Sequence, residues 1–96
     1  MDTINANNLI WDTFNTDHIR KHSVSMQEIV EACGHIVHTE KTKKDRFLMV
    51  GITDKKRILS MVLANKDENQ FYLVTARDAS KKERKIYAQK HKKHNS

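Results

Sequence analysis

The sequence predicts an α+β fold with two short N-terminal helices, an antiparallel sheet of three to four strands and a basic C-terminal helix. Ser-x-x-Glu capping boxes open two of the helical segments, and nearly continuous apolar runs joined by short polar segments indicate the strands. Proline is absent and glycine occurs only at Gly34 and Gly51. Regular elements joined by short turns should therefore make up a single domain, residues 1–96.

The first predicted helix follows Asp12, which has the chemistry of an N-cap. Phe14, His18, Lys21 and His22 then fall on one face at helical spacing. The pattern breaks directly after His22, so we expect the helix to end there.

The second predicted helix starts at the capping box formed by Ser25 and Glu28. A stripe at positions i, i+3, i+4 and i+7 follows, which is the spacing of a buried helical face. The stripe consists of Met26, Ile29, Val30 and Cys33, and Gly34 stands where a helix commonly ends.

Apolar runs predict the sheet and a last capping box predicts the basic helix. The three main strands are Arg46–Thr53, Arg57–Ala64 and Gln70–Ala76, with weaker candidates at Leu9–Trp11 and His35–Thr39. Ser80 and Glu83 form the second Ser-x-x-Glu box, which opens a basic helix running to about Lys90. We expect residues 90–96 to be a frayed basic tail.

Size and cysteine content limit the classes of function. A chain of 96 residues buries one modest core, so any active site should be shallow, which suits a polymer better than a small metabolite. Cys33 is the single cysteine, so no internal disulfide can form, and a reducing, cytoplasmic location is expected. No apolar run approaches the roughly 20 residues that span a bilayer, so no membrane partner is expected.

The net charge of +6 lies entirely in the last twenty residues. Residues 77–96 hold eight lysines and arginines against two acidic residues, whereas residues 1–76 hold ten of each. A neutral body with a cationic arm indicates contact with nucleic-acid phosphate or with an acidic partner. The alternative is a solvated lysine-rich helix that only keeps the protein soluble.

Three groups of residues stand at fixed spacing over about residues 8–87. The first group is Trp11, Asp12, Asn15, His18, Ile19, Lys21, His22, Val24, Ser25 and Glu28. The second is Arg46, Phe47, Gly51 and Thr53, leading to Arg57 and Leu59. The third is Val74, Thr75, Ala76, Arg77, Ala79, Ser80, Glu83, Arg84 and Tyr87. Together the three groups resemble the BrnT family. The chain departs from the family pattern with Ser23 in place of glycine, Tyr72 in place of a basic residue and His35–Lys44 in place of an acidic stretch.

The resemblance implies a RelE-like ribonuclease fold and the toxin half of a bacterial type II toxin–antitoxin pair. Such a toxin arrests growth by cutting RNA. The resemblance further implies a cognate antitoxin with a ribbon-helix-helix DNA-binding domain, which blocks the toxin. DNA would then be contacted only through the antitoxin, when the complex represses its own operon.

The chemistry expected is cleavage without a metal or any other cofactor. Acidic residues do not gather into a plausible Mg²⁺ site in the sequence. RNA can supply its own nucleophile, because its 2′-OH attacks the adjacent phosphate. The protein must then hold the phosphate, stabilise the added negative charge and move two protons, for which arginine and histidine are suited.

Arg57 begins one predicted strand and Arg77 ends the next, so in an antiparallel pair both lie at the same edge. We therefore expect both guanidinium groups to reach one phosphate. The alternative is an ordinary surface arginine in a salt bridge with Asp54, Asp78 or Glu83.

Lys21, His22 and Tyr87 complete the candidate catalytic set, because the resemblance assigns them a place near the site. His22 suits proton transfer, although it could equally serve as a histidine that interacts with the dipole at a helix C-terminus. Tyr87 could stack on a base, act in proton transfer or anchor the last helix to the core.

RNA contacts outside the catalytic set are assigned to Lys81, Arg84 and Lys85 of the basic helix. A second hypothesis keeps these contacts but not cleavage: a weakened module that binds RNA or an acidic partner, which Tyr72 favours. A third, minor hypothesis is a zinc protein, because His18 and His22 have the i, i+4 spacing of two helical ligands.

Overall fold

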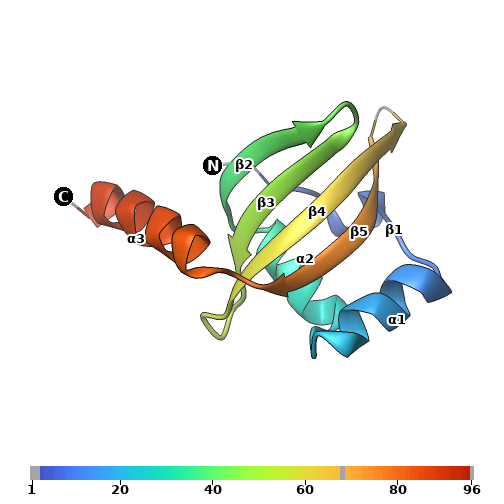
Figure 1. Ribbon diagram of the computed structural model, residues 1–96, viewed down its shortest axis with the longest axis horizontal. Helices are drawn as coiled ribbons and strands as arrows, with labels where there is room; N and C mark the ends of the chain where they lie inside the picture. Colours follow the sequence, from blue (N-terminus) through green and yellow to red (C-terminus); the bar gives the residue numbers. More distant parts are fainter. Residues whose placement is uncertain (1–2, 68, 96) are drawn as a thin grey trace.

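The computed structural model describes residues 3–67 and 69–95 and has an α+β fold. A short 3₁₀ turn, Ala6–Asn8, precedes the main elements. These are, in chain order, β1 (Leu9–Ile10), α1 (Thr13–Lys21), α2 (Met26–Cys33), β2 (Ile36–Lys43), β3 (Arg46–Ile52), β4 (Ile58–Asp67), β5 (Gln70–Asp78) and α3 (Lys81–Asn95). Figure 1 shows α2 behind the sheet, α1 beyond its β5 edge and α3 extending from its end.

The sheet differs from the prediction in strand number and direction. It is five-stranded and mixed, in the order β1-β5-β4-β3-β2, where three to four antiparallel strands were expected. The fifth strand is β1, which pairs in parallel with β5 through Leu9 opposite Phe71 and Ile10 opposite Tyr72. Strand β2 runs on to Lys43 because backbone pairing with β3 continues past the apolar part of the strand.

Both predicted N-terminal helices form, and their caps are reciprocal. The Asp12 carboxylate accepts from the Asn15 amide (2.9 Å), while the Asn15 side chain accepts from the Asp12 amide (3.0 Å). Ser25 and Glu28 make the equivalent pair of bonds at 3.0 and 3.1 Å. Each box satisfies two N–H groups that a helix start otherwise leaves without partners.

The buried stripe predicted for α2 is correct except at its first residue. Ile29 and Cys33 are fully buried, but Met26 is 46% exposed. Met26 lies in the first turn, where it borders an open hollow between α1 and α2 rather than the sheet. Burial raises the pKa of the Cys33 thiol to about 12, so this cysteine stays protonated inside the core.

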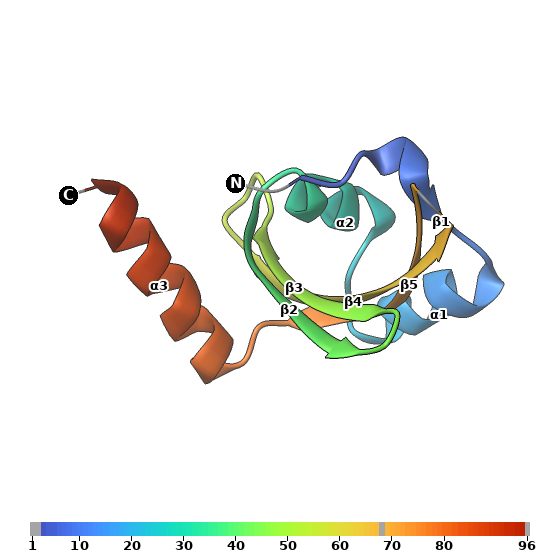
Figure 2. The same ribbon diagram turned by 90° about the horizontal axis from the view of Figure 1, so that it is seen from above.

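The core lies between α2 and the concave face of the sheet, which curves around α2 in Figure 2, and it also includes Ile19 of α1. Helix α2 approaches β3 so closely that a Cβ on Gly51 would stand 2.3 Å from the carbonyl oxygen of Ala32. Glycine is therefore required at position 51 for this packing.

Helix α3 lies outside the curved sheet, on the face opposite α2 (Figure 2). It opens at the predicted capping box, with the Ser80 amide donating to Glu83 at 2.7 Å. Its backbone continues to Asn95, five residues beyond the predicted end at Lys90. Side chains of residues 91–96 lie outside the described part, and fraying of 90–96 stays a prediction. None of the described helices is long and apolar enough to cross a membrane.

Candidate nucleic-acid interface

Arg57, directly before β4, ties four segments of the chain together. Its five N–H donors are all used, by two carboxylates and two backbone carbonyls. The acceptors are Asp78 (Nε–Oδ1 2.7 Å, Nη2–Oδ2 3.2 Å), Glu28 (Nη1 to both oxygens, 3.1 Å), Ser23 O (Nη1, 2.7 Å) and His22 O (Nη2, 3.4 Å). We call Arg57 with these four acceptors the Arg57 clamp. It joins the end of α1, the start of α2 and the end of β5.

Electrostatics in the clamp favour the charged forms of Arg57, Asp78 and Glu28. Hydrogen bonding to Asp78 raises the pKa of Arg57, and hydrogen bonding from Arg57 lowers the pKa of Asp78. The pKa of Glu28 is lowered by the Ser25 amide and, against the opposing effect of burial, by Arg57. A phosphate could reach the Arg57 guanidinium only by displacing one of these carboxylates.

Arg77, near the end of β5, forms a separate ion pair with Glu83 of α3. Its Nη1 donates to Glu83 Oε1 at 3.1 Å and to the Asp78 carbonyl at 2.9 Å. The Arg77 side chain remains 45% exposed, whereas that of Glu83 is 10% exposed. Burial alone would raise the pKa of Glu83, but hydrogen bonds from Ser80 and Arg77 hold it below its ordinary value.

The two arginines lie at the same end of the sheet, as the sequence predicts, but on opposite faces. Arg77 pairs in register with Ser60, whose hydroxyl contacts Glu83 on the α3 side. Asp78, the next residue, therefore points to the face covered by α2, where Arg57 binds it. Asp78 connects the two arginines, because its carboxylate binds Arg57 and its carbonyl binds Arg77. That both guanidinium groups reach one phosphate therefore stays a prediction, and such a phosphate would have to lie at the edge of the sheet that the two faces share.

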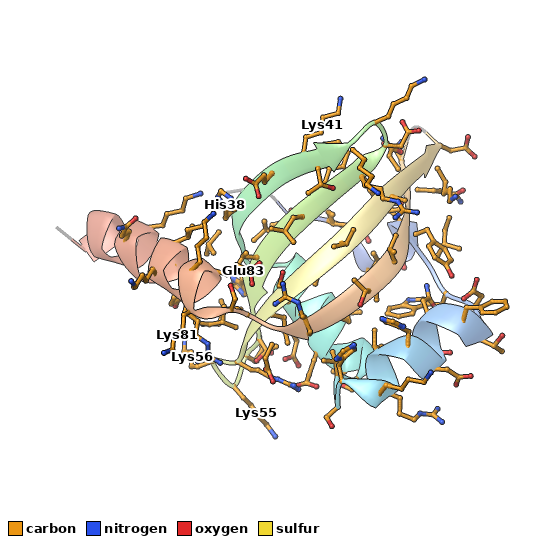
Figure 3. All side chains as sticks on the ribbon, in the orientation of Figure 1. His38, Lys41, Lys55, Lys56, Lys81 and Glu83 are labelled. Atoms are coloured by element: carbon orange, nitrogen blue, oxygen red, sulfur yellow. The ribbon has the colours of Figure 1, made fainter. Side chains whose placement is uncertain are left out.

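The three predicted RNA contacts, Lys81, Arg84 and Lys85, are exposed and lie on the solvent side of α3. Arg84 Nε donates to the Ala79 carbonyl at 3.2 Å, and the positive charge of Arg84 helps to lower the pKa of Asp78. Figure 3 shows Glu83 on the side of α3 that meets the sheet and Lys81 extending away from it. Tyr87 is half-buried.

Lys21 and His22, the proposed catalytic pair, are exposed at the end of α1. They lie on the α2 side of the sheet, next to the Arg57 clamp, because the His22 carbonyl is one of its acceptors. The candidate residues therefore form two groups, separated by the sheet and connected at the Arg57–Asp78–Arg77 edge.

His18 and His22 approach each other, with ring centroids 5.3 Å apart. In the part of the chain that the structure describes, however, no three metal-ligating side chains gather closely enough to hold a metal ion.

Sequence reasoning missed the role of Glu28 and of Asp12. Glu28 was identified only as a capping residue, but it also binds Arg57 across 29 positions of sequence. Asp12 was identified as an N-cap, but its carboxylate also accepts from the hydroxyl of Tyr72 at 2.9 and 3.0 Å. Tyr72 therefore fastens β5 to the start of α1. Its separation of 60 positions from Asp12 gave no local signal.

A hollow of about 560 Å³ lies between α1 and α2, lined in part by Ile19, Arg20, Ser23 and Met26. None of the predicted site residues lines it, so it does not define their site.

Comparison of the chain with protein-family models, curated proteins and solved structures gave no match.

Proposed function

We propose that the protein is the toxin of a type II toxin–antitoxin pair and cleaves cytoplasmic RNA by metal-independent attack of the 2′-OH. The proposal includes a RelE-like architecture and a cognate ribbon-helix-helix antitoxin that blocks the site and contacts DNA. It is supported by the resemblance to the BrnT family and by the charge arrangement at the start of α3.

The observation that carries the proposal is the exposed cationic surface where β5 meets α3. Arg77 is 45% exposed, and the side chains of Lys81, Arg84 and Lys85 follow on the same segment. Arginine forks suit phosphate oxygens, and fixed positive charge stabilises the extra negative charge of a pentacoordinate phosphate. A polyanion is the ligand that such a surface attracts most strongly.

The clamp geometry suggests different roles for the two arginines. Arg77 is the proposed phosphate ligand, because displacing Glu83 exposes its fork on the cationic side. Arg57 is the proposed positioning residue, which holds the Lys21–His22 end of α1 against Asp78. Lys21, His22 and Tyr87 remain the proposed proton-transfer groups.

The test is cleavage of a single-stranded RNA in the presence of EDTA. We expect wild-type protein to cleave and Arg77→Ala to lower the rate at least a hundredfold, since removal of one charge-stabilising donor commonly costs that much. Arg46→Ala, which removes an exposed arginine of β3, is the matched control and should leave the rate unchanged. Equal rates for Arg77→Ala and wild type would refute this site.

The second candidate function is RNA binding without cleavage, and one observation favours it. The two arginines proposed for catalysis are both paired with carboxylates, and Tyr72, which stands in place of a basic residue, is paired with Asp12. RNA binding that persists while no product forms over long incubation would establish this function instead.

A further inference from the structure

Three aromatic side chains form an exposed row along α1. Phe14 and His18 are spaced i, i+4 on α1, and the ring of His22, the residue directly after the helix, lies beside that of His18. Phe14 is 81% exposed, the most exposed large apolar side chain of the described residues. The buried positions of α1 are Asn15 and Ile19, on a different side of the helix. The row therefore does not contribute to the core.

A single exposed phenylalanine is common and needs no explanation. The alignment of Phe14 with two imidazole rings is more specific, because all three side chains are planar and exposed. The imidazoles of His18 and His22 are 5.3 Å apart and tilted by 57°. Each of these rings is a planar partner on which one unpaired base can stack.

The spacing of the row indicates which planar groups would fit. One step of four residues along a helix is about 6 Å. Stacked bases in a duplex strand are about 3.4 Å apart, so successive bases could meet successive rings only when they are unstacked. Unpaired bases that stack on Phe or His side chains are a common mode of single-stranded RNA recognition.

Charge and position also favour RNA. Lys21 lies on the same face as the row, seven residues after Phe14, and is exposed. The row ends at His22, whose carbonyl is held by Arg57, and Arg57 binds Asp78 beside Arg77. The row therefore ends at the residues that connect, through Arg57 and Asp78, to the proposed phosphate ligand Arg77.

We propose that Phe14, His18 and His22 form a stacking platform that binds two or three unpaired bases of single-stranded RNA. The platform deepens the proposed function, on which it rests only for the identity of the ligand as RNA. It sets a preference for unstructured RNA over duplex and supplies base contacts that the lysines of α3 do not.

The test is fluorescence anisotropy of a labelled, unstructured oligouridylate with Phe14→Ala and His18→Ala. Loss of one base–aromatic stack should weaken binding about five- to a hundredfold. Phe14→Trp should bind as tightly as wild type, and its added fluorescence should be quenched by the RNA. Met26→Ala, which removes an exposed apolar side chain of α2 outside the row, is the matched control and should bind normally.

The outcomes separate this proposal from the proposed function. Weaker binding by Phe14→Ala, with unchanged thermal unfolding, supports the platform even if the wild-type protein never cleaves RNA. Unchanged binding by both alanine variants overturns the platform while leaving cleavage at Arg77 intact. If Phe14→Ala instead binds RNA normally but loses inhibition by the cognate antitoxin, the row is a protein-binding surface and the proposal is wrong.

Discussion

Arg57 and Asp78 form a two-point ion pair, with Nε–Oδ1 at 2.7 Å and Nη2–Oδ2 at 3.2 Å, which joins the residue before β4 to the last residue of β5. The Arg57 side chain is 26% exposed, so the pair is partly shielded from water. Because Glu28 shares the same guanidinium, the pair also fixes α2 against the end of the sheet.

The first prediction is that Arg57→Gln destabilises the fold by about 2–3 kcal/mol, because two carboxylates and two carbonyls lose a charged hydrogen-bond donor. Urea unfolding followed by circular dichroism measures the change. Arg20→Gln, an exposed arginine of α1, is the control and should change stability by less than about 0.5 kcal/mol. A similar small effect for both variants would show that the clamp is not structural.

The second prediction concerns acid. The pKa values of Asp78 and Glu28 are lowered in the folded protein from ordinary values of 3.8 and 4.5. In this pH range the unfolded chain therefore binds more protons than the folded protein. The stabilisation is fully present above the ordinary pKa values and is lost as the pH falls through the lower pKa values of the folded protein. The free energy of unfolding should drop below about pH 4.5 more steeply in wild type than in Arg57→Gln. If the free energies of unfolding of the two proteins fall in parallel with pH, the pKa shifts of Asp78 and Glu28 are not caused by Arg57.

The third prediction is that Gly51→Ala destabilises the protein by about 1–3 kcal/mol through overpacking. The added Cβ would meet the Ala32 backbone at 2.3 Å, so α2 must move away from β3. Gly34→Ala is the control, since its Cβ would meet nothing nearer than 3.3 Å. Thermal unfolding compares the two, and equal melting temperatures would argue against the close approach.

The fourth prediction concerns the cationic face of α3. Replacing Lys81, Arg84 and Lys85 by glutamine should weaken binding to single-stranded RNA. The slope of log affinity against log salt should become less negative by roughly 2, because each lost phosphate contact reduces the magnitude of the slope by about 0.7. The matched control replaces Lys41, Lys43 and Lys44 of the β2–β3 hairpin, which removes the same charge from another exposed segment. Equal slopes for both triple variants would show attraction by net charge alone.

The sequence predicted the helix starts well because each start is marked locally. Asp12, Ser25 and Ser80 all cap helices as expected. Strand β1 was harder to predict as part of the sheet, because two residues carry no periodicity and only pairing with β5 defines them.

The placement of Arg77 could not be predicted because a bulge reverses the faces of β5. Val62 of β4 pairs with Thr75, but the next residue, Leu63, pairs with Leu73, so β5 has one additional residue at this point. Leu73 and Ala76 are therefore both buried although they are three positions apart, whereas residues on one face of a regular strand are an even number of positions apart. One additional residue sends every later side chain to the opposite face. Without the bulge, Arg77 would share the face of Leu73 and lie with Arg57.

The central claim is metal-independent cleavage of RNA, and mass spectrometry of the ends formed from single-stranded RNA in EDTA tests it most directly. The account predicts 2′,3′-cyclic phosphate ends paired with 5′-hydroxyl ends, and their loss with Arg77→Ala. Intact RNA after incubation with folded wild-type protein, or 3′-hydroxyl ends that form only when Mg²⁺ is added, would contradict it.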